Sequence, residues 1–124
     1  MAEGLVLQEQ RSLARRELIY YLKISDRKSG REIGRMGDIH AEGMLVMSEK
    51  PLAVGLKYDA SLELPKALQA AGQTEVFLQF EVVWSRPGPK NSTYQENGGR
   101  FIAPDQNQQN IVGQLIELFA MPGQ

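Results

Sequence analysis

The sequence predicts a mainly β domain: a small six-stranded antiparallel (split) β-barrel with a C-terminal α-helix packed on it. Short segments rich in aromatic and β-branched residues recur between residues 18 and 103, separated by turn formers. One of them, at 76–84, alternates clearly between apolar and polar residues, and after Pro104 the hydrophobic period becomes helical. The 124 residues, 42% of them hydrophobic, suffice for one domain with a core but not for two of ordinary size.

Three strands are predicted in the N-terminal half of the chain. The first is "LIYYLKI" at 18–24, which ends at the turn formers "SDRKSG". The second is "REIGRMGDI" at 31–39 and the third is "GMLVMS" at 43–48, with "HAEG" as the tight connection between them. Methionines in this region are predicted to fill the core: Met36, Met44 and Met47.

Three further strands are predicted before the helix. "LKYDASLEL" at 56–64 alternates and is expected to be half buried. "VFLQFEVVW" at 76–84 places five residues on one apolar face: Val76, Leu78, Phe80, Val82 and Trp84. A long loop, "RPGPKNSTYQENGG" at 86–99, is expected to precede a short sixth strand, "RFIA" at 100–103.

A C-terminal helix is predicted after Pro104. Asp105 is of a type that caps helix N-termini, and the "PG" at 122–123 is expected to close the helix. Gly113 inside the helix is expected to cost about 1 kcal/mol relative to alanine. The apolar residues at helical spacing are Ile111, Val112, Leu115, Ile116 and Phe119.

The composition excludes several kinds of chemistry. The chain has no cysteine, which rules out disulfides, thiolate catalysis and cysteine-bound zinc. No apolar run approaches the roughly 20 residues that span a bilayer, and the N-terminus lacks the pattern of a secretory signal. We therefore expect a soluble, cytoplasmic protein that does not insert into a membrane.

Charge is distributed unevenly along the chain. The net charge of −1 argues against general binding of DNA or RNA, but residues 1–35 carry eight of the 14 Lys and Arg and only five of the 15 Asp and Glu. This end of the chain can hold an anion or can be a solvated arm of mixed charge. We expect an N-terminal arm at 1–16 and the folded domain at 17–121.

The stretch "GDIHAEGM" at 37–44 contains His40, the only histidine of the chain. In an extended segment Asp38, His40 and Glu42 would share one face and present three potential metal ligands. The turn predicted at "HAEG" breaks this alternation, and zinc and iron sites usually use several His or Cys residues. A Ser-His-Asp triad would also depend on His40, and no "GxSxG" is present. We therefore expect neither a metal site nor an enzyme.

Arginines cluster just before the first predicted strand, in "RSLARR". Arg11 and Arg15 are four residues apart, so they would share a face of a helix, and in a loop either could wrap around a ligand. A guanidinium binds a phosphate or the O6/N7 edge of guanine with two parallel hydrogen bonds, and its plane can stack on a base. The arginines alone are compatible with a solvent-exposed basic arm as well as with a binding site.

Four segments, taken in order, resemble a PilZ domain, the bacterial receptor module for cyclic di-GMP: "RSLAR", "LIYYLKISDRKSGREIGRMGDIHAEGMLV", "VVWS" and "GGRF". The resemblance extends from about Arg11 to the final helix. The signature of the family combines an Arg-x-x-x-Arg stretch in a flexible N-terminal segment with an Asp/Asn-x-Ser-x-x-Gly stretch between two strands. The family fold is a six-stranded barrel with a C-terminal helix.

The resemblance implies which residues bind cyclic di-GMP, a dianion with two guanines. Arg11 and Arg15 would contact phosphate and guanine, and Asp38 would accept hydrogen bonds from N1 and N2 of a guanine. Gly43 would permit the turn and close approach of the backbone. His40 stands where the family usually has serine; a neutral imidazole has one donor and one acceptor to replace the hydroxyl, but it is bulkier. No further cofactor and no metal are expected.

Three other residues are candidates for contact with the ligand. Arg16 adjoins Arg15. Arg100 lies on the opposite strand face from Phe101, where it can reach a phosphate or be solvated. Trp84 is predicted to pack in the core, with stacking at the barrel mouth as the alternative.

Two functions follow from these observations. In the first, an arm carrying Arg11 and Arg15 folds over cyclic di-GMP held at Asp38, His40 and Gly43, and the ordered arm changes the surface that a protein partner contacts. Such a receptor would serve motility, biofilm or envelope processes. The alternative is a PilZ-like adaptor that binds no nucleotide and acts by protein–protein interaction through an apolar patch. The receptor requires the two arginines, whereas the adaptor tolerates their loss.

Overall fold

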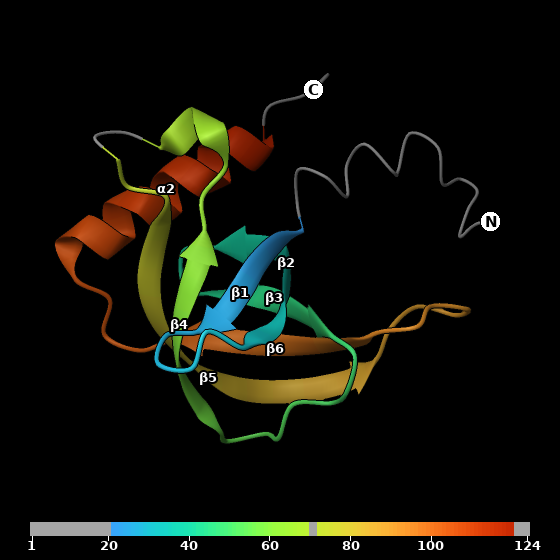
Figure 1. Cartoon of the computed structure of the whole chain (residues 1–124). Helices are drawn as coiled ribbons and strands as arrows, with labels where there is room; N and C mark the ends of the chain where they lie inside the picture. Colours follow the sequence, from blue (N-terminus) through green and yellow to red (C-terminus); the bar gives the residue numbers. More distant parts are fainter. Residues whose placement is uncertain (1–20, 70–71, 121–124) are drawn as a thin grey trace.

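The computed structural model describes residues 21–69 and 72–120, which form a closed antiparallel barrel and a C-terminal helix (Figure 1). The six strands of this part of the chain are β1 (Leu22–Asp26), β2 (Glu32–His40), β3 (Gly43–Ser48), β4 (Lys57–Glu63), β5 (Glu75–Pro87) and β6 (Gln95–Phe101). A short 3₁₀ helix η1 (Lys66–Leu68) follows β4, and α2 (Gln106–Ala120) follows β6. The strand order around the barrel is β1-β2-β3-β6-β5-β4, and β4 pairs with β1 to close it. The predicted fold class is therefore confirmed.

Alternating side chains of the strands fill the inside of the barrel. On β5, four of the five residues predicted to form the apolar face are buried: Val76, Leu78, Phe80 and Val82. The three methionines predicted to fill the core, Met36, Met44 and Met47, are buried as well. Most inward positions are apolar, and most polar residues of the same strands point to the outer face of the barrel; the buried polar exceptions are Ser48 and Asn97.

Helix α2 packs against β2 and β5 and lies at the upper left of the barrel in Figure 1. Its predicted N-cap is confirmed: the carboxylate of Asp105 accepts a hydrogen bond from the backbone N–H of Gln108 at 2.8 Å, and Oε1 of Gln108 accepts one from the N–H of Asp105 at 2.8 Å. The residues that α2 buries are Ile111, Val112 and Leu115. Within the described residues, no helix is long and apolar enough to cross a membrane.

Gly113 lies on the exposed side of α2, where an added β-carbon would meet no atom within 4 Å. We expect Gly113→Ala to stabilise the protein by about 0.5–1 kcal/mol, because alanine has the higher helix propensity, and to raise the Tm by about 3 °C. Thermal unfolding followed by circular dichroism measures the shift. Gly30→Ala is the matched control: its β-carbon also meets nothing, but its φ of +76° disfavours alanine and should lower the Tm. A lower Tm for Gly113→Ala would contradict the prediction.

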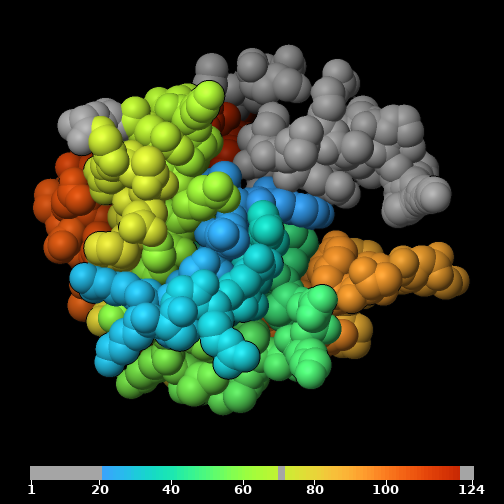
Figure 2. Space-filling model, in the orientation of Figure 1, coloured from blue at the N-terminus to red at the C-terminus, as the bar shows by residue number. Residues whose placement is uncertain are grey.

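The hairpin of β5 and β6 is longer than predicted. The expected loop at 86–99 and strand at 100–103 are wrong, because β5 continues to Pro87 and β6 already begins at Gln95. The sequence "QENGGRF" has few strand-forming residues, but the segment pairs with β3 on one side and with β5 on the other. This pairing overrides its low propensity. The tip of the hairpin projects from the barrel at the right of Figures 1 and 2.

Candidate functional site

The predicted site residues that the structure describes meet on the outer face of the barrel, across β2, β3, β6 and β5. The strand registers align two rows of outward positions. The first row is Asp38, Leu45, Gly98 and Trp84; the second is His40, Gly43, Arg100 and Glu81. Four of the candidates thereby line one hollow of about 440 Å³: Asp38, His40, Trp84 and Arg100.

A β-bulge in β2 turns Asp38 toward this hollow. Met36 pairs with Val46 and Asp38 pairs with Leu45, so Gly37 is an extra residue without a partner position. Without the bulge, Met36 and Asp38 would point to the same side of the sheet. Instead Met36 is buried in the core while Asp38 is exposed. The Asp38 carboxylate accepts a hydrogen bond from the N–H of the next residue at 2.9 Å.

Trp84 lies on the outside of the barrel, so its predicted place in the core is wrong. The register shifts between Val82 and Trp84, which makes Val83 an extra residue and reverses the alternation after Val82. The indole is 38% exposed and covers Gly98, where an added β-carbon would lie 2.2 Å from the indole Nε1. The bulge therefore moves the tryptophan to the wall of the outer hollow. Because Gly98 has no side chain, the indole can pack directly on the backbone of β6.

His40 is the last residue of β2 and precedes the two-residue turn to β3. Its Nδ1 accepts a hydrogen bond from the N–H of Glu42 at 3.3 Å, so the proton of the neutral ring is on Nε2. In the described part of the chain, no hydrogen bond joins His40 to Asp38, as a catalytic triad would require. Likewise, no group of three or more His, Asp or Glu residues among those described could hold a metal ion.

Gly43 allows β3 to approach β6 closely. A β-carbon added to Gly43 would lie 2.1 Å from the carbonyl oxygen of Gly99, which belongs to the backbone and cannot move aside. A side chain at this position would therefore push the strands apart. The barrel itself therefore requires this glycine, which stands between His40 and Arg100 in the second row.

Two arginines border the hollow from β5 and β6. Arg100 points outward, opposite the buried Phe101 as predicted, and its guanidinium lies 3.0 Å from the carboxylate of Glu81. The Cζ of Arg86 lies 4.7 Å from the centroid of the Trp84 ring, a cation–π contact. Arg86 therefore places positive charge beside the indole, and Arg100 places it elsewhere on the wall of the hollow.

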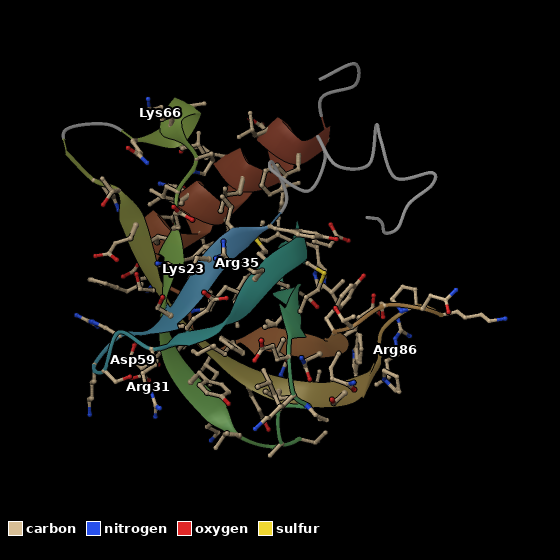
Figure 3. All side chains as sticks on the ribbon, turned by 45° about the vertical axis from the view of Figure 1, so that its right-hand side comes forward. Lys23, Arg31, Arg35, Asp59, Lys66 and Arg86 are labelled. Atoms are coloured by element: carbon tan, nitrogen blue, oxygen red, sulfur yellow. The ribbon has the colours of Figure 1, made fainter. Side chains whose placement is uncertain are left out.

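Arg86 was not among the candidates from the sequence. The sequence predicts a long loop at this position, whereas Arg86 belongs to β5, where its guanidinium lies 2.9 Å from the carboxylate of Glu96 on β6. Figure 3 shows Arg86 at the β5–β6 hairpin, away from Lys23 and Arg35, which lie over β1 and β2. A longer predicted hairpin would have placed it near Trp84.

The other predicted ligand contacts, Arg11, Arg15 and Arg16, lie outside the described residues, as does the arm expected at 1–16. Comparison of the chain with protein-family models, with curated proteins and with solved structures finds no match. The fold and the site together define a six-stranded barrel with a tryptophan-lined hollow of mixed polar and apolar residues on its outer face. Its function is inferred from the chemistry of that hollow and from the motifs that line it.

Proposed function

We propose that the protein is a PilZ-like receptor for cyclic di-GMP. The observation that carries the proposal is the convergence of Asp38, His40, Trp84 and Arg100 on one outer hollow, although they come from three strands. Asp38 and Gly43 occupy the positions of the second family motif, at the hairpin of β2 and β3. The hollow thus combines residues of the second motif with the ring of Trp84 and the guanidinium of Arg100, which are not part of that motif.

The side chains of the hollow match the chemistry of a guanine nucleotide. The carboxylate of Asp38 can accept the N1–H and N2–H donors of a guanine edge. The exposed face of Trp84 offers a stacking surface, and stacking of a base on an aromatic side chain contributes about 1–3 kcal/mol. Nε2–H of His40 supplies a donor in place of the usual serine hydroxyl, and Arg100 supplies charge for a phosphate.

The N-terminal segment is proposed to supply the remaining contacts. Arg11 and Arg15 precede β1, which is the neighbour of β2 in the barrel. In this proposal the two guanidinium groups bind the ligand from the side opposite Asp38 and hold the segment over the hollow. The ligand stabilises the arrangement in which the N-terminal segment covers the hollow, because it makes additional contacts with the two arginines in that arrangement. A protein partner would then bind the surface that this change creates.

Calorimetric titration of cyclic di-GMP tests this function. We expect the wild-type protein to bind with a Kd that is micromolar or tighter, and Arg15→Ala to bind at least tenfold more weakly, a loss of about 1.4 kcal/mol. Arg31→Ala, which removes an exposed arginine from the chain segment between β1 and β2, is the matched control and should bind like the wild type. GTP, with one guanine, is the control for specificity and should bind more weakly.

Absence of binding to folded wild-type protein would contradict the receptor function. That outcome would favour the adaptor, which acts by protein–protein interaction alone. Equal losses for Arg15→Ala and Arg31→Ala would show that positive charge, and not the Arg-x-x-x-Arg motif, determines affinity.

A further inference from the structure

In the second row of the site, two side chains that can donate hydrogen bonds, His40 and Arg100, stand on either side of a glycine, and both line the hollow. His40 and Arg100 flank Gly43, which has no side chain, on the outer face of three adjacent strands. Strands are about 4.8 Å apart, so the backbones of His40 and Arg100 are separated by roughly 10 Å. The imidazole Nε2–H and the guanidinium can therefore approach one small anionic group from opposite sides.

The guanidinium of Arg100 is held loosely by Glu81. A single nitrogen, Nη2, contacts Oε1 of the carboxylate at 3.0 Å, and the Arg100 side chain is 62% exposed while that of Glu81 is 27% exposed. An arginine has five N–H donors, and an ion pair with such exposure contributes little to stability. A phosphate that offers two oxygens in a bidentate arrangement can compete for this guanidinium.

The neighbouring ion pair, Arg86 and Glu96, has more contacts than the pair of Arg100 and Glu81, and its carboxylate is more buried. Both Nε and Nη2 of Arg86 contact one oxygen of Glu96, at 3.0 and 2.9 Å, and the Glu96 side chain is only 13% exposed. The same guanidinium lies over the Trp84 ring. The Arg86 side chain is as exposed as that of Arg100, at 64% against 62%, but it has two contacts to a more buried carboxylate and one to the indole. We therefore expect Arg100 to exchange its partner more readily than Arg86.

We propose that the part of the hollow between His40 and Arg100 is a phosphate subsite, in which Glu81 competes with the ligand phosphate for Arg100. This inference rests on the proposed function and adds that Glu81 lowers the affinity of the site for cyclic di-GMP. Glu81 neutralises Arg100 when no ligand is present, and a phosphate must displace it. The carboxylate thereby selects for ligands with enough negative charge to make the exchange favourable.

Titration of cyclic di-GMP into Glu81→Gln tests the competition. We expect Glu81→Gln to bind about three- to fivefold more tightly than the wild type, the gain that corresponds to releasing a partly exposed ion pair. Glu32→Gln is the matched control: it removes the same charge from the pair with Arg35 at 3.1 Å, which lies outside the hollow, and should leave affinity unchanged. The gain should disappear in an Arg100→Gln background.

The outcomes separate this inference from the receptor function. Binding by the wild type with no gain in Glu81→Gln, an equal gain in Glu32→Gln, or a gain that persists with Arg100→Gln would each overturn the subsite and leave the receptor in place. Absence of binding by both the wild type and Glu81→Gln would overturn both proposals. Binding by Glu81→Gln but not by the wild type would contradict the receptor function of the wild-type protein, although it would support competition between Glu81 and the ligand for Arg100.

Discussion

Replacing Phe80 by alanine is expected to destabilise the protein by about 3–5 kcal/mol, the usual loss for truncating a fully buried aromatic side chain. Phe80 has no exposed surface, and its ring stacks on that of Tyr58 with the centroids 5.2 Å apart. It also fills the space left by the missing side chain of Gly99, whose added β-carbon would lie 2.7 Å from the ring. Urea denaturation measures the loss in the free energy of unfolding.

Phe77→Ala is the matched control for this prediction. Phe77 belongs to the same strand but points outward, is 38% exposed, and contacts the guanidinium of Arg27, whose Cζ lies 3.9 Å from the ring centroid. Its truncation removes little buried area and one cation–π contact, so we expect a loss of about 1 kcal/mol. Equal losses for the two variants would contradict the assignment of Phe80 to the core and Phe77 to the outer face.

Asn97→Ala should cause the second largest loss, about 2–4 kcal/mol, because it leaves buried polar groups without partners. The side chain is fully buried on β6. Its Nδ2 donates to the carbonyl of Val46 and to the hydroxyl of Ser48, both at 2.9 Å, and its Oδ1 accepts from the N–H of Leu52 at 3.1 Å. Asn97 thus fastens β6 to β3 and to the segment that follows β3.

Urea denaturation of Asn97→Ala beside Asn110→Ala checks this expectation. Asn110 is exposed on α2 and its side chain bonds only that of Gln106 among the interactions of the described residues, so its removal should cost less than about 0.5 kcal/mol. A small loss for Asn97→Ala would show that water or relaxation of the strands replaces its hydrogen bonds. It would contradict the role of Asn97 in holding the two central strands of the site together.

The pattern of the sequence predicted the barrel because most strands bury one face. On β5 the alternation identifies the core side as far as Val82, and on α2 the helical period and Asp105 identify both the buried face and the start. The pattern failed for β6, where neighbouring strands and not local propensity determine the conformation. It failed for Trp84 because a bulge at Val83 reverses the alternation, and the sequence alone does not show where an extra residue interrupts a ladder.

The site was predictable only to the extent that a contiguous motif encodes it. Asp38, His40 and Gly43 lie within six residues of each other, and the structure places them at one hairpin. Glu81 and Arg86 were not recognised, because their relevance depends on the register between β5 and β6, which brings them next to Arg100 and Glu96. The spacing of residues along the sequence does not show which residues of two strands pair with each other.

The fluorescence of Trp84 tests most directly whether the outer hollow binds cyclic di-GMP, as we propose. Trp84 is the only tryptophan of the chain and lies in the wall of the hollow, so its emission reports on this site alone. Titration with cyclic di-GMP should change the emission saturably, with the same Kd as calorimetry, and Asp38→Ala should shift the curve to higher ligand concentration. Emission that stays constant while calorimetry detects binding would place the ligand elsewhere and contradict the account.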